Sequence, residues 1–163
     1  MASNIAGVPV VSFASHNDTT PIVPPGTIKE DKATSKVYKY ILVEDANLAV
    51  GDVVEYSDVS GYEVTKDRAG GSSLGRVVAG VALGTVTDGK YGWIQVSGLN
   101  TYCKTDGSVA VGDALVPHAT ADGQADTAAS GSTVVNTEAQ VFGYSLVADT
   151  TSASSAVMLR CAY

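Results

Sequence analysis

Few residues of this chain are of the types that usually carry out catalysis. The only two histidines are His16 and His118, and serines are so frequent that a serine near a histidine in sequence means nothing. The sequence contains no HExxH or CxxC arrangement for zinc, no EF-hand loop for calcium and no GxxxxGK[ST] loop for phosphate. We therefore predict that the protein is not an enzyme and that it carries no cofactor.

Four aspartates could in principle hold a divalent cation, because carboxylates are its usual ligands. They fall within one stretch, as Asp106, Asp113, Asp122 and Asp126. However, Gly-Asp and Asp-Gly pairs are also typical of turns, where glycine adopts positive φ and aspartate accepts a backbone hydrogen bond. We interpret these aspartates as turn residues and predict no metal site.

The two cysteines, Cys103 and Cys161, are too few for the disulfide framework of a secreted scaffold. Both lie at or after the end of an expected strand, so a disulfide between them is geometrically possible. Two buried free thiols are the favoured interpretation, because cysteine is among the most buried residue types.

The charge of the chain excludes some partners. Its formal net charge is −7, with 10 basic and 17 acidic residues, whereas a nucleic-acid-binding surface needs a basic patch. No apolar segment approaches the roughly 18 residues of a membrane span, and no signal peptide is recognisable. We expect a protein made in a cytoplasm, with no nucleic-acid or membrane partner. Charged residues make up only 17% of the chain, which suggests that a partner covers part of the surface.

A β-hairpin is expected between residues 76 and 98. An apolar run from 77 to 86 and a second run from 91 to 96 are separated by Thr87-Asp88-Gly89-Lys90. Asp-Gly between such runs predicts a type I′ turn, in which both central residues have positive φ. In the second run, Ile94 and Val96 share one face, while the aromatic residues and Gln95 share the other. Trp93, the only tryptophan, is therefore either a core residue, which we favour, or part of an interface.

An internal repeat organises the rest of the chain. Four segments return in the same order at offsets of 61 to 63 residues: 50–54 as 111–115, 60–63 as 122–125, 78–83 as 141–146, and 94–96 as 157–159. Persistent order and spacing indicate a duplication. Chance similarity among all-β turn and strand patterns is the alternative. We predict an all-β fold, with a compact barrel or sandwich body at 37–163 built from repeat units at about 37–98 and 99–163.

Residues 1–36 differ from this body. Four of the five prolines lie before Gly26, and proline cannot donate to a strand ladder. We predict an extended N-terminal arm, either loose or ordered against a neighbouring subunit. Residues 27–36 are charged and are expected to form a helical turn or a linker. The arm is also rich in apolar side chains, which makes it a candidate contact surface.

Several strand and turn segments of the sequence resemble those of a known protein family. GDVV at 51–54, VAGVALGTV at 78–86, DGKYGWIQVSG at 88–98, VGDALVP at 111–117 and VFGYSLVAD at 141–149 resemble the capsid-decoration, or cement, proteins of tailed bacteriophages. The resemblance implies a β-rich virion protein on the outer capsid surface. Such a protein would bridge major capsid protein subunits, stabilise the shell and form a homo-oligomer, with a trimer favoured. The apparent duplication and the long arm depart from the smallest members of this group.

The candidate contacts with the capsid or another partner are Val8, Val10, Val11, Phe13, Ile22, Val23 and Trp93. The alternative function is a receptor- or carbohydrate-binding β module of a phage tail or fibre. That module would present a groove of exposed aromatics, for which Tyr56, Tyr62, Tyr91 and Trp93 are available.

Overall fold

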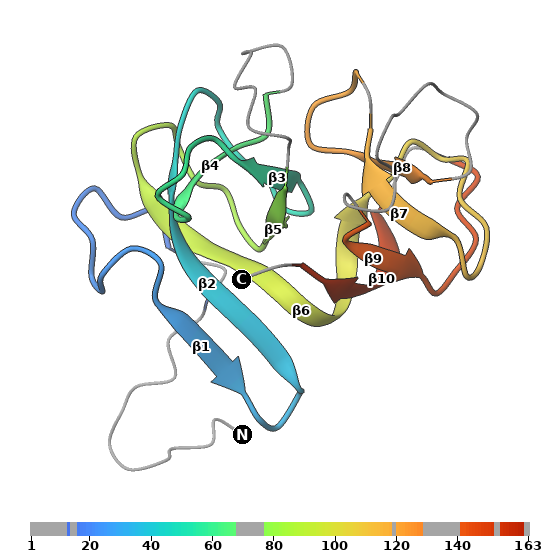
Figure 1. The fold of residues 1–163 in the computed structure, drawn as a ribbon, viewed down its shortest axis with the longest axis horizontal. Helices are drawn as coiled ribbons and strands as arrows, with labels where there is room; N and C mark the ends of the chain where they lie inside the picture. Colours follow the sequence, from blue (N-terminus) through green and yellow to red (C-terminus); the bar gives the residue numbers. More distant parts are fainter. Residues whose placement is uncertain are drawn as a thin grey trace.

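The fold is all-β, as predicted (Figure 1). The computed structural model describes residues 13, 16–67, 77–118, 120–128, 141–151 and 154–161. Across these residues there are ten strands and no α-helix, and hence no helix that could cross a membrane. The strands are β1 (Ile28–Asp31), β2 (Lys36–Val43), β3 (Val53–Tyr56), β4 (Glu63–Thr65), β5 (Val78–Ala82), β6 (Tyr91–Lys104), β7 (Ala114–Pro117), β8 (Ala125–Thr127), β9 (Gly143–Ser145) and β10 (Ser154–Arg160).

The first part of the sheet closes on itself as a five-stranded barrel. β2 pairs with the first half of β6, β6 with β5, β5 with β3, and β3 with β4, all antiparallel. The ring closes because β4 returns to β2 as a parallel neighbour, with Leu42 opposite Glu63. Ile41, Val54 and Ile94 are completely buried in its core. We call this ring barrel 1.

The second part of the sheet repeats this arrangement. The second half of β6 pairs with β10, β10 with β9, β9 with β7, and β7 with β8. A parallel bridge between Thr105 and Ala125 then joins β8 to the end of β6 and closes the ring. Leu115, Val157 and Leu159 lie in its core. We call this ring barrel 2.

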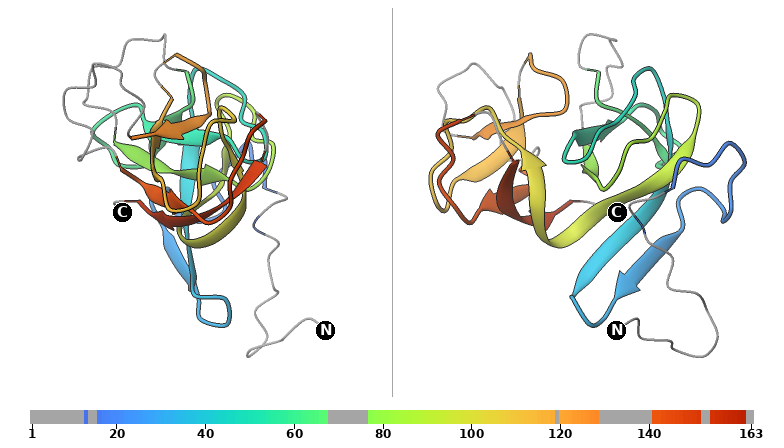
Figure 2. Two further views of the ribbon diagram at one scale, coloured as in Figure 1. Left: turned by 90° about the vertical axis from the view of Figure 1, so that its right-hand side faces the viewer. Right: turned by 180° about the vertical axis from the view of Figure 1, so that it is seen from behind.

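Strand β6 belongs to both barrels. It is 14 residues long and runs from one lobe of the molecule to the other, as Figures 1 and 2 show. Its course changes near Gly98, which has a φ of +91°. A side chain at Gly98 would place its Cβ 2.6 Å from the carbonyl oxygen of Ser35, so the two backbones can approach only because this residue is glycine. One strand therefore ends the first repeat and begins the second.

The hydrogen bonds confirm the repeat that the sequence predicts. Gly51 donates its N–H to Ala82, and Gly112 donates in the same way to Ser145. The carboxylate of Asp52 accepts from the N–H of Ala49 at 2.8 Å, and Asp113 accepts from Ala110 at 2.8 Å. Equivalent turns thus hold equivalent strands in both barrels. The exact division into an arm at 1–36 and a body at 37–163 remains a prediction.

The predicted hairpin has the right strands but a different turn. β5 and β6 are antiparallel, with Ala82 opposite Ile94. However, β5 ends at Ala82, and Val86 instead forms a bridge with Leu48. Gly89 has a φ of +73° whereas Asp88 does not have positive φ, so the type I′ prediction was wrong. The segment between β5 and β6 leaves the ladder to form this bridge, so the connection is longer than a two-residue turn.

The expectation of a helical turn or linker at 27–36 was also wrong. Residues 28–31 form β1, which pairs antiparallel with β2, and a turn joins the two strands. The Asp31 carboxylate accepts hydrogen bonds from the Ala33 N–H at 3.0 Å and the Thr34 hydroxyl at 2.6 Å. This local capping makes a hairpin out of a charged segment that has little apolar pattern of its own.

Candidate docking site

The described part of the arm packs against the β strands of its own chain. Asp18 exchanges backbone hydrogen bonds with Tyr91 at 2.9 Å each way, so the arm adds a short bridge to the edge of β6. The Asp18 carboxylate also accepts the hydroxyl hydrogen of Tyr40 at 2.7 Å and lies 3.0 Å from Nδ1 of His16. Burial, followed by this hydrogen bond to a carboxylate, raises the pKa of Tyr40 well above its usual range. Asp18 therefore anchors the arm on β2 and β6, and His16 contacts it from within the arm.

An aromatic cluster forms the surface on which the arm lies. Its members are Phe13 from the arm, Tyr38 and Tyr40 from β2, and Tyr91 and Trp93 from β6. The Phe13 ring is stacked on Tyr38 with centroids 4.2 Å apart and meets Trp93 edge-on at 5.1 Å. Such offset and edge-to-face pairs are favourable beyond the area that they bury. The cluster exists because residues of one parity on β2 and β6 share the outer face of barrel 1.

The predicted contact residues separate into three groups. Phe13 and Val23 pack into the aromatic cluster, and Trp93 is only 2% exposed beneath them. The favoured interpretation of Trp93 as a core residue is thus confirmed. Ile22 points outward and is 54% exposed. Val8, Val10 and Val11 lie outside the described residues. Of the predicted contacts that the structure describes, Ile22 is therefore the one whose side chain is mostly exposed.

A pocket of about 430 Å³ opens beside the aromatic cluster. Its walls include Phe13, Tyr38, Leu83, Gln95, Thr101 and Tyr102. Both halves of β6 contribute, so the pocket lies where the arm and the two barrels meet. None of the four aromatics that the sequence offered for a groove lines it. The sequence did not point to Tyr102, because a single aromatic residue among polar ones produces no alternating hydrophobic pattern.

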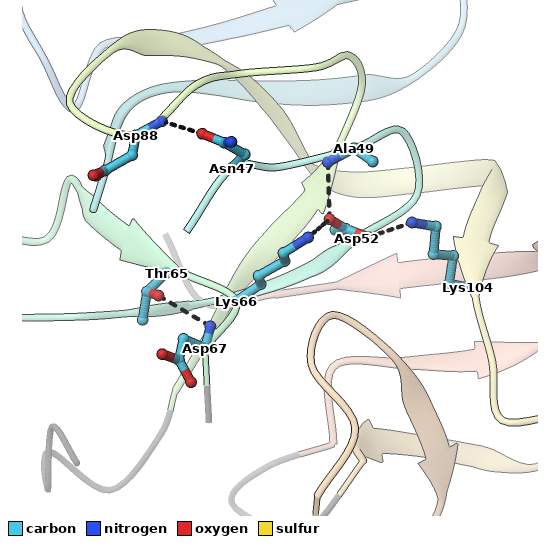
Figure 3. Close-up of polar contacts among 8 residues, drawn as sticks. All are labelled: Asn47, Ala49, Asp52, Thr65, Lys66, Asp67, Asp88 and Lys104. Carbon is cyan, nitrogen blue, oxygen red and sulfur yellow. Dashed lines mark hydrogen bonds and ion pairs between the residues drawn. The ribbon is translucent and has the colours of Figure 1, made fainter. Parts of the chain in front are cut away.

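The junction between the barrels centres on a buried carboxylate (Figure 3). Asp52 is 2% exposed and is paired with Lys66 at 2.9 Å and with Lys104 at 2.5 Å. Lys66 follows β4 of barrel 1, whereas Lys104 ends β6 where barrel 2 closes. The two ammonium groups compensate the cost of burying the negative charge. One aspartate thus links the two halves of the molecule.

Backbone contacts continue this junction. The N–H of Lys104 donates to the carbonyl of Gly51, and the N–H of Val53 donates to the carbonyl of Gly123, each at 2.9 Å. Since Gly123 lies in the turn between β7 and β8, a turn of barrel 2 docks on β3 of barrel 1.

One group of side chains has the composition of a metal site. Potential ligand atoms of Asp106, His118 and Asp126 all lie within 4.8 Å of one another. However, Nδ1 of His118 accepts hydrogen bonds from the N–H groups of Thr120 and Ala121, at 3.1 and 2.8 Å. A neutral imidazole whose Nδ1 accepts carries its proton on Nε2 and has no second lone pair to offer a cation. Asp106 accepts a backbone hydrogen bond in a turn, as predicted, whereas Asp126 lies in β8 and accepts from the N–H of Thr127, so the turn prediction was wrong for Asp126.

One serine motif lies between β4 and β5. Residues 71–75 read GSSLG, which has the form GxSxG. The segment lies outside the described residues. The elements that flank it are β4 and β5, whereas the nucleophile elbow with this pattern connects a strand to a helix. Its flanking strands therefore give no support for a hydrolase site.

Comparison with known proteins yields one similar structure. No family model and no curated protein sequence matches the chain. Among solved structures, the N-terminal base of the head fibre protein gp8.5 of bacteriophage phi29 is similar, with a TM-score of 0.48 and 16% sequence identity. The match covers 76% of this chain and 93% of that one. A TM-score at this level does not establish a common fold.

Proposed function

We propose that this chain is a structural virion protein that binds the outer surface of a phage capsid and stabilises the shell by bridging major capsid protein subunits. The observation that carries the proposal is a rigid β framework that presents apolar side chains outward from an anchored arm. Ile22 and Ile28 on the arm are 54% and 46% exposed. Apolar side chains held in this way suit adhesion to another protein surface.

The chemistry of the described residues also favours adhesion. Nδ1 of each histidine makes a local hydrogen bond, and Asp106, Asp113 and Asp126 each accept a backbone hydrogen bond. The motif resemblance to capsid-decoration proteins, described from the sequence, points to the same role. Binding to many equivalent sites on a shell would give high avidity from modest contacts.

Co-sedimentation with expanded, empty phage shells tests this proposal. We expect the wild-type protein to pellet with the shells, and the double variant Ile22→Ser/Ile28→Ser to lose at least tenfold in affinity. Val77→Ser is the matched control, because Val77 is also an exposed apolar residue but lies beside β3, where its carbonyl accepts the N–H of Tyr56. Failure of the wild-type protein to bind, or equal binding by the arm variant, would count against capsid attachment through the arm.

The pocket supports a second candidate, a receptor- or carbohydrate-binding module. Tyr102 is 54% exposed at its rim, and aromatic faces with nearby amide and hydroxyl groups are typical of sugar sites. A glycan array probed with the purified protein distinguishes the two functions. Binding that disappears in Tyr102→Ala and persists in Tyr144→Ala would favour this second candidate.

A further inference from the structure

Barrel 2 carries an exposed apolar row on its outer face. Leu99 on β6 is opposite Met158 on β10, and Met158 is opposite Tyr144 on β9. Their side chains are 40%, 39% and 42% exposed, respectively. Direct cross-strand neighbours on one face lie about 5 Å apart, so the three form a continuous patch.

The equivalent row of barrel 1 is buried. Tyr38, Gln95 and Val81 occupy the same positions in the repeat and are cross-strand neighbours in the same way. They are 8%, 1% and 0% exposed, respectively. Phe13 covers the Tyr38 end. At the other end Val81 is paired with Val53, whose N–H reaches the Gly123 turn of barrel 2. Within the chain, this face is thus an interface.

The turn that docks on barrel 1 also has a free counterpart. A Cβ at Gly123 would lie 3.0 Å from the Asp52 carboxylate, so this turn of barrel 2 is packed against barrel 1. Its equivalent in barrel 1 is the Gly61 turn, where a Cβ would meet nothing within 4 Å among the residues described. The same turn carries Val59, which at 86% is the most exposed large apolar side chain in the described part of the chain.

A second pair of glycines shows the same asymmetry. A Cβ at Gly51 would lie 1.9 Å from the carbonyl oxygen of Tyr102, so barrel 2 closes over this turn of barrel 1. At Gly112, the equivalent turn of barrel 2, the described residues leave the space open. Among the described residues, each half of the internal junction therefore has an open equivalent: the Gly61 turn on barrel 1 and the Leu99–Met158–Tyr144 row on barrel 2.

We propose that the Val59–Gly61 turn of one copy docks on the Leu99–Met158–Tyr144 row of a second copy, which repeats between molecules the junction that joins the barrels within one. The occupant is argued from continuity: inside the chain the Gly123 turn docks at Val53, the cross-strand neighbour of Val81, and Gly61 and Tyr144 hold the positions equivalent to Gly123 and Val81. Such a head-to-tail contact uses two different surfaces and closes into a ring or extends as an array. It does not depend on attachment to a capsid.

Analytical ultracentrifugation of the full chain tests the interface. We expect the wild-type protein to sediment as an oligomer and the double variant Leu99→Ser/Met158→Ser to sediment as a monomer. Val59→Ser should weaken self-association at least tenfold, whereas Ile22→Ser, an exposed apolar change on the arm, should not. Circular dichroism verifies that each variant remains folded. A monomeric wild-type protein, or a double variant of unchanged mass, would overturn the proposal.

Disulfide trapping tests which surfaces meet. Val59→Cys and Tyr144→Cys, prepared separately and mixed under mild oxidation, should give a crosslinked pair that neither variant gives alone. Val77→Cys mixed with Tyr144→Cys is the control, and the native thiols are buried and give little background. Crosslinking of Tyr144→Cys with itself would show that the rows meet each other, and would overturn the head-to-tail arrangement.

Discussion

Phe13 contributes more to the fold than its place in a proline-rich arm suggests. Its ring contacts both Tyr38 and Trp93. We expect Phe13→Ala to lower the free energy of unfolding by about 2 kcal/mol, less than for a fully buried phenylalanine because Phe13 is only partly buried. Urea unfolding followed by Trp93 fluorescence measures this change. Ile22→Ala is the control and should change stability by less than about 0.5 kcal/mol.

Asp52 and Asp113 are equivalent in the repeat but differ in their partners. Asp52 faces Lys66 and Lys104, whereas Asp113 accepts the turn N–H of Ala110. Asp52→Asn should destabilise the protein by about 2 kcal/mol, a value reduced from that of a fully buried pair because both lysines are partly exposed. Asp113→Asn retains an acceptor oxygen and should be nearly neutral. Equal effects in thermal unfolding would contradict a special role for Asp52.

We predict that the two buried thiols make the folded protein less stable at alkaline pH. Burial raises the pKa of Cys103 and of Cys161 to about 12, from ordinary values near 9. Between these values the unfolded chain has released its thiol protons while the folded chain retains them, so the free energy of unfolding falls as pH rises. Below pH 9 both states are protonated and the thiols have no effect. Cys103→Ala should flatten the decline between pH 9 and 11 in urea titrations.

Residue types allowed some of these roles to be predicted. The turn function of Asp106 and Asp113 follows from the chemistry of Asp-Gly and Gly-Asp pairs. Strand parity placed Trp93 on the face opposite Ile94, but it did not show that the arm covers that face. The sequence could not predict that Asp52, rather than Asp113, forms the ion pairs of the junction. The two lysines that pair with Asp52 come from distant positions in the chain.

At the scale of elements, the two Gly-Asp turns offer a matched test of the junction. Gly51 and Gly112 have φ values of +85° and +88°, so alanine is strained at both by about 1 kcal/mol. Only at Gly51 would the Cβ collide with a backbone carbonyl. We expect Gly51→Ala to destabilise by several kcal/mol more than Gly112→Ala. Differential scanning calorimetry of both variants measures the difference, and similar melting temperatures would contradict the close packing at Gly51.

The arm shows where reasoning from sequence reached its limit. Its apolar content suggested contact with a neighbouring subunit or disorder, yet residues 16–31 pair with and pack against β2 and β6 of the same chain. The alternation of residues in the sequence did show that these strands carry aromatic side chains on one face. It could not show which segment of the chain covers that face. Deletion of residues 1–26 would therefore uncover the aromatic cluster, and is a poor test of attachment.

At the scale of the molecule, the two barrels should unfold as one unit. They share β6, and their buried residues form one hydrophobic cluster that includes Val54 of barrel 1 and Leu115 of barrel 2. Trp93 reports on barrel 1, whereas far-UV circular dichroism reports on both barrels. We expect the two signals to give the same urea midpoint and slope. A second transition seen only by circular dichroism would show that barrel 2 unfolds independently.

The duplicated architecture was predictable because it leaves a trace in turn chemistry, which recurs at 61 to 63 residues. The closure of each unit into a ring was not, since it depends on the parallel contacts of β2 with β4 and of Thr105 with Ala125. β4 and β8 have only three residues each, and another strand lies between the partners in sequence, so no local pattern pairs them.

The shared strand has a mechanical consequence. When the two lobes are pulled apart, tension runs lengthwise along β6, and the ladders that it forms with β2 and β10 are loaded in shear. All the hydrogen bonds of a ladder then resist together, whereas a hinge between separate domains would open one bond at a time. A molecule stretched across a surface that swells would in this way transmit load through its backbone without coming apart.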